Sequence, residues 1–335
     1  MKHTLFLFCT CLLLGCLHSC KEGGNGRKSM LQPVTGGTNE LLVITPKVRW
    51  EGAIGDTIRE YFGQAQAGLP QGEPMFDLLN LPYSSFEKSV RAHRNVLIVS
   101  LKSKADSASI TYSDSPWART QKVFRIVAPT EEAFYEIFRE NKERMMGVFL
   151  RAERERLMEV YKKNPDQKVF NLFKEKYNML LYCPGGYRIN KDTADFAWVS
   201  METAVNSRGV IFFQEPYTHE SQLNYRIILE RVNEELQKHI PGPLDSTWMA
   251  LDMVTPVTAA NYEYNGKHYA FLFKGLWMVA NDYMGGPFVL NTVLDRENNR
   301  VIYMMGYVYA PEDKKRNLLR QVESIVFSMN LDYEK

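Results

Sequence analysis

"TEEAFYEIFRENKERMMGVFLRAERERLMEVYKK", residues 130–163, is the stretch that organises the chain. Its apolar side chains recur every three or four residues, as they do along one face of a helix. They are Phe134, Phe138, Met145, Phe149, Ala152, Leu157 and Tyr161. Thr130 is a favourable N-cap, and the carboxylates of Glu131 and Glu132 suit the positive end of a helix. The sequence therefore predicts one long helix that runs to about Lys163 and ends before the next proline.

Charged residues fill the other positions of this helix, in the runs "RENKER" (139–144) and "RAERER" (151–156). A basic or partner-binding surface is one interpretation. The alternating signs favour another, an exposed face that carries ion pairs between residues four apart. The helix restarts in "DQKVFNLFKEKYN" (166–178), so we expect this region to join two halves, residues 41–165 and 166–335.

The first half alternates strand and helix patterns. Strands are predicted in "NELLVITP" (39–46), "NVLIVSL" (95–101), "SASITYS" (107–113) and "QKVFRIVA" (121–128). Short helices are predicted in "GDTIREYFGQA" (55–65) and "LPYSSFEKSVRAHRN" (81–95). In the second of these, Ser84 and Glu87 have the spacing of a capping box.

The second half is richer in strands. They are "FAWVSMET" (196–203), "GVIFFQE" (209–215), "TWMALDMV" (247–254), "KHYAFLFKGLWMVA" (267–280), "PFVLNTVLD" (287–295) and "NRVIYMMGYVYA" (299–310). Helices are predicted over 220–240 and 311–329, the latter with Pro311 in its first turn. The prediction is an α+β fold with mainly antiparallel sheets, packing helices and two halves joined by a long helical segment.

Composition limits the class of protein. The chain has 335 residues, 45% hydrophobic and 24% charged, with a net charge of +2, which is typical of a globular body. A nucleic-acid partner is not expected, because binding one calls for a basic stripe. The best later apolar run, "AFLFKGLWMVA", is interrupted by Lys274 and is too short to span a bilayer.

The N-terminus predicts secretion. Met1, Lys2 and His3 precede an apolar run of about 13 residues, 5–17, which is shorter than the roughly 20 residues of a membrane-spanning helix. Residues 1–19 are therefore predicted to be a signal peptide. Residues 20–40, with five glycines, are predicted to be a flexible linker.

"LHSC", residues 17–20, resembles the lipobox of bacterial lipoproteins, although His18 is unusual there. The resemblance implies that Cys20 is acylated, with chains such as palmitate, and becomes the new N-terminus. "LLGC", which ends at Cys16, is a competing box, but Cys20 is preferred because a charged stretch follows it directly. The alternative interpretation of the whole N-terminal segment is a plain secretory signal without lipidation. Several acyl chains would hold the protein on a membrane lastingly.

Three further stretches carry a second resemblance: "LLVITPKVRWEGAIGDTIREYF" (41–62), "RNVLIVSL" (94–101) and "MGYVYAPEDKKRNLLRQVESI" (305–325). They resemble a family of Bacteroidota lipoproteins catalogued as a domain of unknown function, over nearly the whole mature chain. The last half also loosely resembles PsbP-like sandwiches. The resemblance to the Bacteroidota lipoproteins implies a lipid-anchored outer-membrane protein that faces either the periplasm or the cell surface. The cell surface is considered because Lys21 and Glu22 follow Cys20. It implies no reaction.

Catalytic signatures are missing from the sequence. The histidines of the mature chain, His93, His219, His239 and His268, have no helical partner for a metal, and no phosphate-binding, nucleophile-elbow or dinucleotide motif occurs. We therefore predict no catalytic, cofactor-binding or metal residue. The acids weighed for hydrolysis are Glu202, Glu215, Asp252 and Asp282, which would need to face one another across a cleft.

Cys183 and the late aromatic residues complete the candidates. Cys183 could be a nucleophile, but a small buried apolar residue is the favoured interpretation, since no motif supplies a base. Trp277 and Tyr283, beside the turn at Gly285, are the first place to look for a binding face, although most of the aromatic residues are expected in the core.

Three hypotheses follow for the function. The first is a non-catalytic envelope lipoprotein that binds or helps assemble a protein partner. The second is a surface module that binds glycan or peptide. The third is a hydrolase with an acid pair. An exposed apolar patch would favour the first, an outward aromatic row the second, and two carboxylates in a deep pocket the third.

Overall fold

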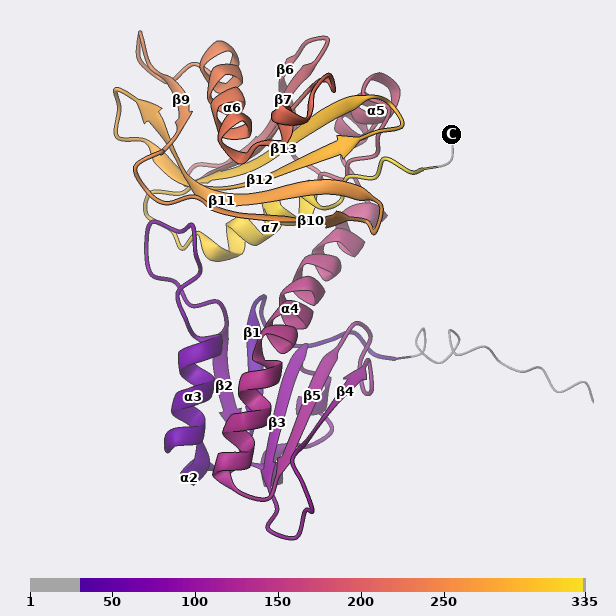
Figure 1. Cartoon of the computed structure of the whole chain (residues 1–335), viewed down its shortest axis with the longest axis vertical. Coiled ribbons are helices and arrows are strands. Elements are labelled where there is room, and N and C mark those ends of the chain that lie inside the picture. Colours follow the sequence, from indigo (N-terminus) through magenta and orange to yellow (C-terminus); the bar gives the residue numbers. More distant parts are fainter. Residues whose placement is uncertain (1–30, 334–335) are drawn as a thin grey trace, which may run out of the picture.

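The structure is a computed structural model that describes residues 31–333, and it consists of two lobes joined by one long helix (Figure 1). The smaller lobe holds β1 (Glu40–Ile44), α2 (Lys47–Trp50), α3 (Ala53–Phe62), β2 (Asp77–Leu81), β3 (Asn95–Leu101), β4 (Ser109–Asp114) and β5 (Lys122–Ala128). The joining helix is α4 (Glu131–Lys163). The larger lobe holds α5 (Gln167–Lys176), β6 (Arg188–Asp192), β7 (Phe196–Glu202), β8 (Ser207–Pro216), α6 (Tyr225–His239), β9 (Trp248–Leu251), β10 (Thr258–Tyr264), β11 (His268–Ala280), β12 (Gly285–Asp295), β13 (Arg300–Tyr309) and α7 (Arg316–Val326).

The larger sheet is antiparallel throughout, in the order β10-β11-β12-β13-β8-β7-β6, and β9 also pairs with β11. Its apolar side chains alternate between two faces. One face packs against α5 and α7, and the other packs against α6. The predicted α+β class, with mainly antiparallel sheets and two halves joined by a long helix, is confirmed.

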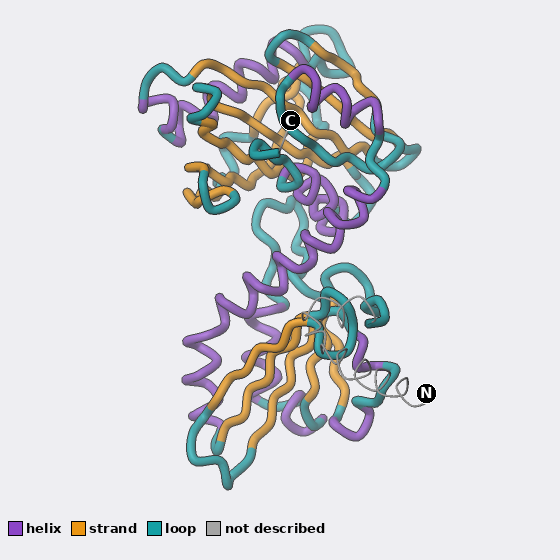
Figure 2. Tube along the Cα trace, turned by 90° about the vertical axis from the view of Figure 1, so that its right-hand side faces the viewer, coloured by secondary structure: helices purple, strands orange, loops and turns teal. Residues whose placement is uncertain are grey.

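The smaller sheet has the order β2-β1-β3-β5-β4, and three of its four pairings are parallel, β2 with β1, β1 with β3 and β3 with β5. Only β4 runs antiparallel to its neighbour. Helices α3 and α4 cover one face with a large apolar core, and loops cover part of the other face over a smaller one (Figure 2). These parallel pairings were not anticipated, because strand patterns in a sequence do not reveal strand direction.

Helix α4 has the predicted bounds and cap. The Thr130 side chain accepts a hydrogen bond from the Ala133 amide. Phe134 and Phe149 pack in the core of the smaller lobe, whereas Tyr161 packs in that of the larger. One helix therefore contributes to both cores.

The charged face of α4 differs from the favoured interpretation. No ion pair between α4 residues four apart is formed in the described chain, and Glu153 is buried instead. Its carboxylate accepts hydrogen bonds from Arg94 (2.7 Å), Asn95 (2.7 Å), Arg156 (2.6 Å) and the Asn39 amide (3.2 Å). This Glu153 network ties α4 to the start of β1 and β3.

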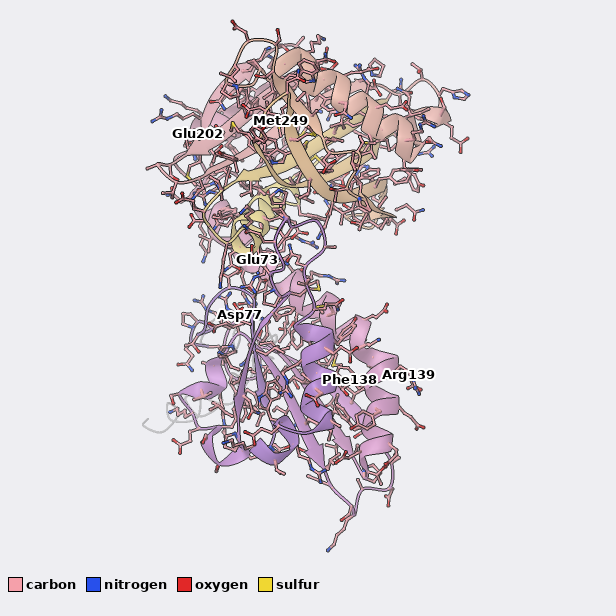
Figure 3. All side chains as sticks on the ribbon, turned by 90° about the vertical axis from the view of Figure 1, so that its left-hand side faces the viewer. Glu73, Asp77, Phe138, Arg139, Glu202 and Met249 are labelled. Atoms are coloured by element: carbon pink, nitrogen blue, oxygen red, sulfur yellow. The ribbon has the colours of Figure 1, made fainter. Side chains whose placement is uncertain are left out.

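The two lobes also meet where α7 begins (Figure 3). Glu73, in the loop between α3 and β2, accepts hydrogen bonds from the amides of Lys315 (2.6 Å) and Arg316 (3.1 Å). The Arg316 guanidinium pairs with Asp77 at 2.6 Å. A carboxylate of the smaller lobe thus caps a helix of the larger one, and it also offsets the partial positive charge there.

A buried group of charges, the junction cluster, lies beside this cap. Glu323 of α7 is 3% exposed and is surrounded by Arg320, Lys274 (3.0 Å) and Arg154 (3.9 Å). Arg154 comes from α4 and Lys274 from β11, so the cluster joins three elements. One carboxylate holds three basic side chains there.

Three local predictions were wrong. Residues 81–95 form no α-helix: Leu81 ends the unpredicted strand β2, and short 3-10 helices follow at Tyr83–Ser85 and Val90–Ala92. Packing of Phe86 and Val90 on the second face of the sheet overrides the local capping signal of Ser84 and Glu87. Helix α7 begins at Arg316 rather than at Pro311, because its cap is Glu73. The helix predicted over 220–240 is divided at Asn224, whose side chain caps α6.

Strands β6 and β10 were also missed, and both are largely exposed edge strands without an alternating apolar pattern. No helix within residues 31–333 has both the length and the apolar character that crossing a bilayer requires.

Candidate binding crevice at the carboxyl edge of the smaller sheet

The candidate site is a cavity of about 460 Å³ in the smaller lobe, which we call the basic crevice. Its lining residues are Thr45, Pro46, Arg49, Tyr83, Ser100, Leu101, Lys102 and Arg125. Thr45 follows β1 directly, and Lys102 follows β3 directly. The crevice therefore lies at the carboxyl ends of two adjacent parallel strands.

This place is a topological switch point. From β1 the chain goes to β2 on one side of the sheet, and from β3 it goes to β4 and β5 on the other. In parallel sheets with this reversal, the connections diverge and leave a crevice outside the carboxyl ends of the strands, where ligands bind.

Strand alternation explains how Arg125 reaches the crevice. Its neighbours Phe124 and Ile126 pack in the core beneath α3 and α4, so Arg125 lies on the opposite face of β5. Ser100 of β3 shares that face, since Leu97 and Val99 pack in the helix-covered core. Arg125 is exposed on this face.

Tyr83 forms one wall and is fixed by its hydroxyl. The hydroxyl donates to the Val99 carbonyl and lies 2.8 Å from Ser100 Oγ. Burial raises the pKa of Tyr83, while the Ser100 hydrogen bond and the charge of Arg125 act in the other direction. The Tyr83 side chain is therefore uncharged, and its hydroxyl fixes it to the end of β3.

The charged side chains that line the crevice are all basic. The lining contains three basic side chains and no acidic one. Arg49 pairs with Glu131 at the start of α4. Within residues 31–333, the Lys102 ammonium and the Arg125 guanidinium have neither a hydrogen-bond nor an ion-pair partner. The arrangement can hold an anion, and its lining offers no carboxylate to act as a base or nucleophile.

A larger cavity of about 570 Å³, on the opposite side of the lobe, is less suited to a ligand. Its walls carry both signs of charge, and Lys122 pairs there with Asp114 at 3.1 Å. The Arg156 guanidinium donates hydrogen bonds to Glu153, Asn95 and backbone carbonyls. Burial lowers the pKa of Arg156 to about 10. Arg156 and Lys122 therefore serve the fold, and the acidic side chains of this lining make it less suited to an anion than the basic crevice.

The predicted aromatic face does not form. Trp277 is 4% exposed and its indole donates to the Val308 carbonyl at 3.1 Å, whereas Tyr283 is fully exposed in the next loop. Alternation along β11 points Trp277, like Phe273 and Val279, into the core beside α6. The two residues therefore share no binding surface.

The acids considered for hydrolysis are also dispersed. Glu202 pairs in register with Ser207, and Glu215 lies eight residues further along the same strand, a separation of roughly 26 Å at about 3.3 Å per residue. A glycosidase holds its two carboxyls within about 10 Å. Asp252 accepts from Thr255, and Asp282 from the Tyr283 amide. Glu215 accepts hydrogen bonds from Tyr303 and Arg231, so these acids are held in structural contacts.

Cys183 is completely buried, and burial raises the pKa of its thiol well above the usual range. This environment fits the favoured interpretation of an inert core residue. His219 caps a short helix, with its ring nitrogen accepting from the Ser221 amide. Cys16, Cys20 and the first half of the predicted linker lie outside the described residues.

Sequence reasoning missed every polar residue of the basic crevice. Lys102 directly after the apolar run 95–101 was one available signal. Its meaning depends on the parallel pairing of β1 with β3, which places the two strand ends side by side.

Comparisons with known proteins agree with the two-lobed architecture. Residues 34–162 match a family model described as a domain of unknown function (DUF8532), and residues 166–328 match another described as a domain of unknown function (DUF4837). No curated protein matches the chain. Among solved structures, a mutant of protein Mog1 is similar, with 8% identity and a TM-score of 0.30 over 46% of this chain and 90% of that one. Each lobe thus matches one catalogued domain of unknown function.

Proposed function

We propose that the protein is a lipid-anchored protein of the bacterial cell envelope that acts as a non-catalytic binding module, with the basic crevice as its binding site. The observation that carries the proposal is a crevice in which Lys102 and Arg125 have no partner among residues 31–333 and whose lining contains no acid. Such a site can hold an anionic ligand, and it lacks the paired groups that a hydrolase needs.

The anchoring half of the proposal rests on the sequence. An apolar run too short to span a membrane, a lipobox ending at Cys20 and a glycine-rich linker follow one another in the order that a bacterial lipoprotein requires. The outer membrane is the proposed location, by resemblance to the lipoproteins of Bacteroidota.

The geometry of the smaller lobe supports an N-terminal anchor combined with binding in the basic crevice. The second half of the predicted linker packs on the lobe at the amino ends of the strands, where Pro33 bridges Arg119 and Thr35 bridges His93. The crevice lies at the carboxyl ends, about 23 Å away along a seven-residue strand such as β3. A protein held through its N-terminus would present the crevice away from the attachment point.

The anchor is tested by a pair of cysteine variants. Cys20→Ser is expected to abolish incorporation of labelled palmitate and to move the protein from the detergent phase to the aqueous phase, because the acyl acceptor is gone. Cys16→Ser is the matched control and should keep both label and partitioning. Label that persists in Cys20→Ser but disappears in Cys16→Ser would assign the anchor to the other cysteine.

The binding role is tested on the mature, full-length protein in detergent. Small molecules extracted from the envelope should include a ligand that raises the melting temperature of the wild type, since a ligand at 100 times its Kd adds about 2.7 kcal/mol to stability. The double variant Lys102→Gln/Arg125→Gln should not respond. The ligand should be recovered with unchanged mass, and its chemical conversion would contradict a non-catalytic role.

A further inference from the structure

The basic crevice holds two positive charges that the described part of the protein does not compensate. Lys102 and Arg125 have no partner among residues 31–333, whereas Arg49 is neutralised by Glu131. Exposed cations seldom gather without acids between them, because like charges repel. Here they gather at the one place in this sheet where the topology opens a crevice.

We infer that the basic crevice binds the phosphoryl group of a small phosphomonoester, an assignment that rests on the proposed binding role. A phosphomonoester carries a charge of about −1.5 to −2 at neutral pH, which matches two uncompensated cations, whereas a carboxylate carries one charge. Its three terminal oxygens accept hydrogen bonds in several directions. The fork of Arg125 and the three donors of Lys102 can supply them together.

The rest of the ligand has a place in the same crevice. A volume of about 460 Å³ suits a small molecule and exceeds what a bare phosphate fills. The uncharged wall consists of the Tyr83 ring, Pro46 and Leu101, with Thr45 and Ser100 nearby. An aliphatic or sugar-like body with hydroxyl groups fits this mixture of apolar and hydroxyl-bearing side chains.

The test is calorimetric titration of the mature, full-length protein in detergent with two probes, glycerol 3-phosphate and glycerate. Glycerol 3-phosphate is expected to bind with one site and more tightly than glycerate, which offers a carboxylate on a similar chain. Lys102→Gln and Arg125→Gln should each weaken binding by about tenfold or more, since each removes a charge-assisted hydrogen bond.

Arg188→Gln is the matched control. Arg188 is exposed on β6 in the larger lobe and has no ion-pair partner in the described chain, so its loss removes the same charge far from the crevice. It should leave the affinity unchanged. Unchanged melting temperatures will show that all three variants fold, because each side chain is exposed. Equal binding of glycerate, no binding of either probe, or the same loss in Arg188→Gln would overturn the phosphomonoester assignment.

The phosphomonoester could belong to a soluble metabolite or to a lipid headgroup, and vesicles separate these sources. Phosphatidic acid carries a phosphomonoester, whereas phosphatidylglycerol carries a diester with one charge. Cosedimentation of Cys20→Ser protein with phosphatidic acid vesicles alone, reduced by Arg125→Gln, would support a lipid source. Calorimetric binding of glycerol 3-phosphate without cosedimentation with vesicles would support a soluble metabolite as the source. A different ligand in the crevice would leave the binding role in place and overturn only its assigned chemistry.

Discussion

Glu323→Ala is expected to destabilise the protein by about 3–5 kcal/mol, because it leaves buried basic side chains without their counter-ion. Glu323 is the single carboxylate of the junction cluster, and both Arg320 and Lys274 lose their partner with it. Urea unfolding of the wild type and the variant measures the difference. Glu312→Ala, an exposed acid in the loop before α7, is the control and should change stability by no more than about 0.5 kcal/mol.

The stability difference between the wild type and Glu323→Ala should depend on pH. Burial would raise the pKa of Glu323, but Arg320, Lys274 and Arg154 outweigh it and hold the pKa well below the ordinary value. A folded pKa below the unfolded one, about 4.3, contributes stability above that pH and loses it as the pH falls. The gap between wild type and Glu323→Ala should therefore be full at pH 7 and shrink below about pH 4.3. A gap that widens in acid would contradict the ion pairing.

Glu153→Ala should have an effect of similar size, confined at first to the smaller lobe. The variant leaves the guanidinium groups of Arg94 and Arg156 without their carboxylate, which costs about 3–5 kcal/mol for a buried pair. Amide hydrogen exchange can localise the loss. Protection in β1 and β3 should fall by two to three orders of magnitude, at about 1.4 kcal/mol for each tenfold change.

The control for this experiment lies two residues away on the same helix. Glu155 is exposed, so Glu155→Ala should leave protection in β1 and β3 within about threefold of the wild type. Equal protection in Glu153→Ala and Glu155→Ala would mean that the Glu153 network does not hold α4 to the sheet.

Local features of the sequence were sufficient to predict much of the fold. The cap at Thr130 and the apolar stripe of α4 depend on residues close together in the chain, so both were predicted with the right bounds. Strands β7, β8, β12 and β13 carried β-prone runs and turn residues, and they also formed as predicted.

Long-range contacts account for what could not be predicted. The start of α7 depends on Glu73, which is more than 240 residues away in the chain. Glu153 looked like one charge among many in "RAERER", and its burial depends on Asn39, Arg94 and Asn95 meeting at the strand ends. The basic crevice was invisible for the same reason, since Arg49, Lys102 and Arg125 come from three separate segments.

The side on which an aromatic residue lies was equally hard to read. Trp277 lies in β11 and Tyr283 in the turn between β11 and β12, yet one is in the core and the other is in water. Strand alternation fixes relative sides along β11, but it does not say which side is covered. Helix α6, which covers that side, is more than 35 residues away from Trp277 in the chain.

A crystal structure of the protein soaked with glycerol 3-phosphate tests most directly whether the basic crevice is the binding site. We expect phosphoryl density within hydrogen-bond distance, about 2.7–3.2 Å, of Lys102 Nζ and the Arg125 guanidinium, with the glycerol carbons against Tyr83. Density for the ligand elsewhere, with the crevice filled only by water, would contradict it.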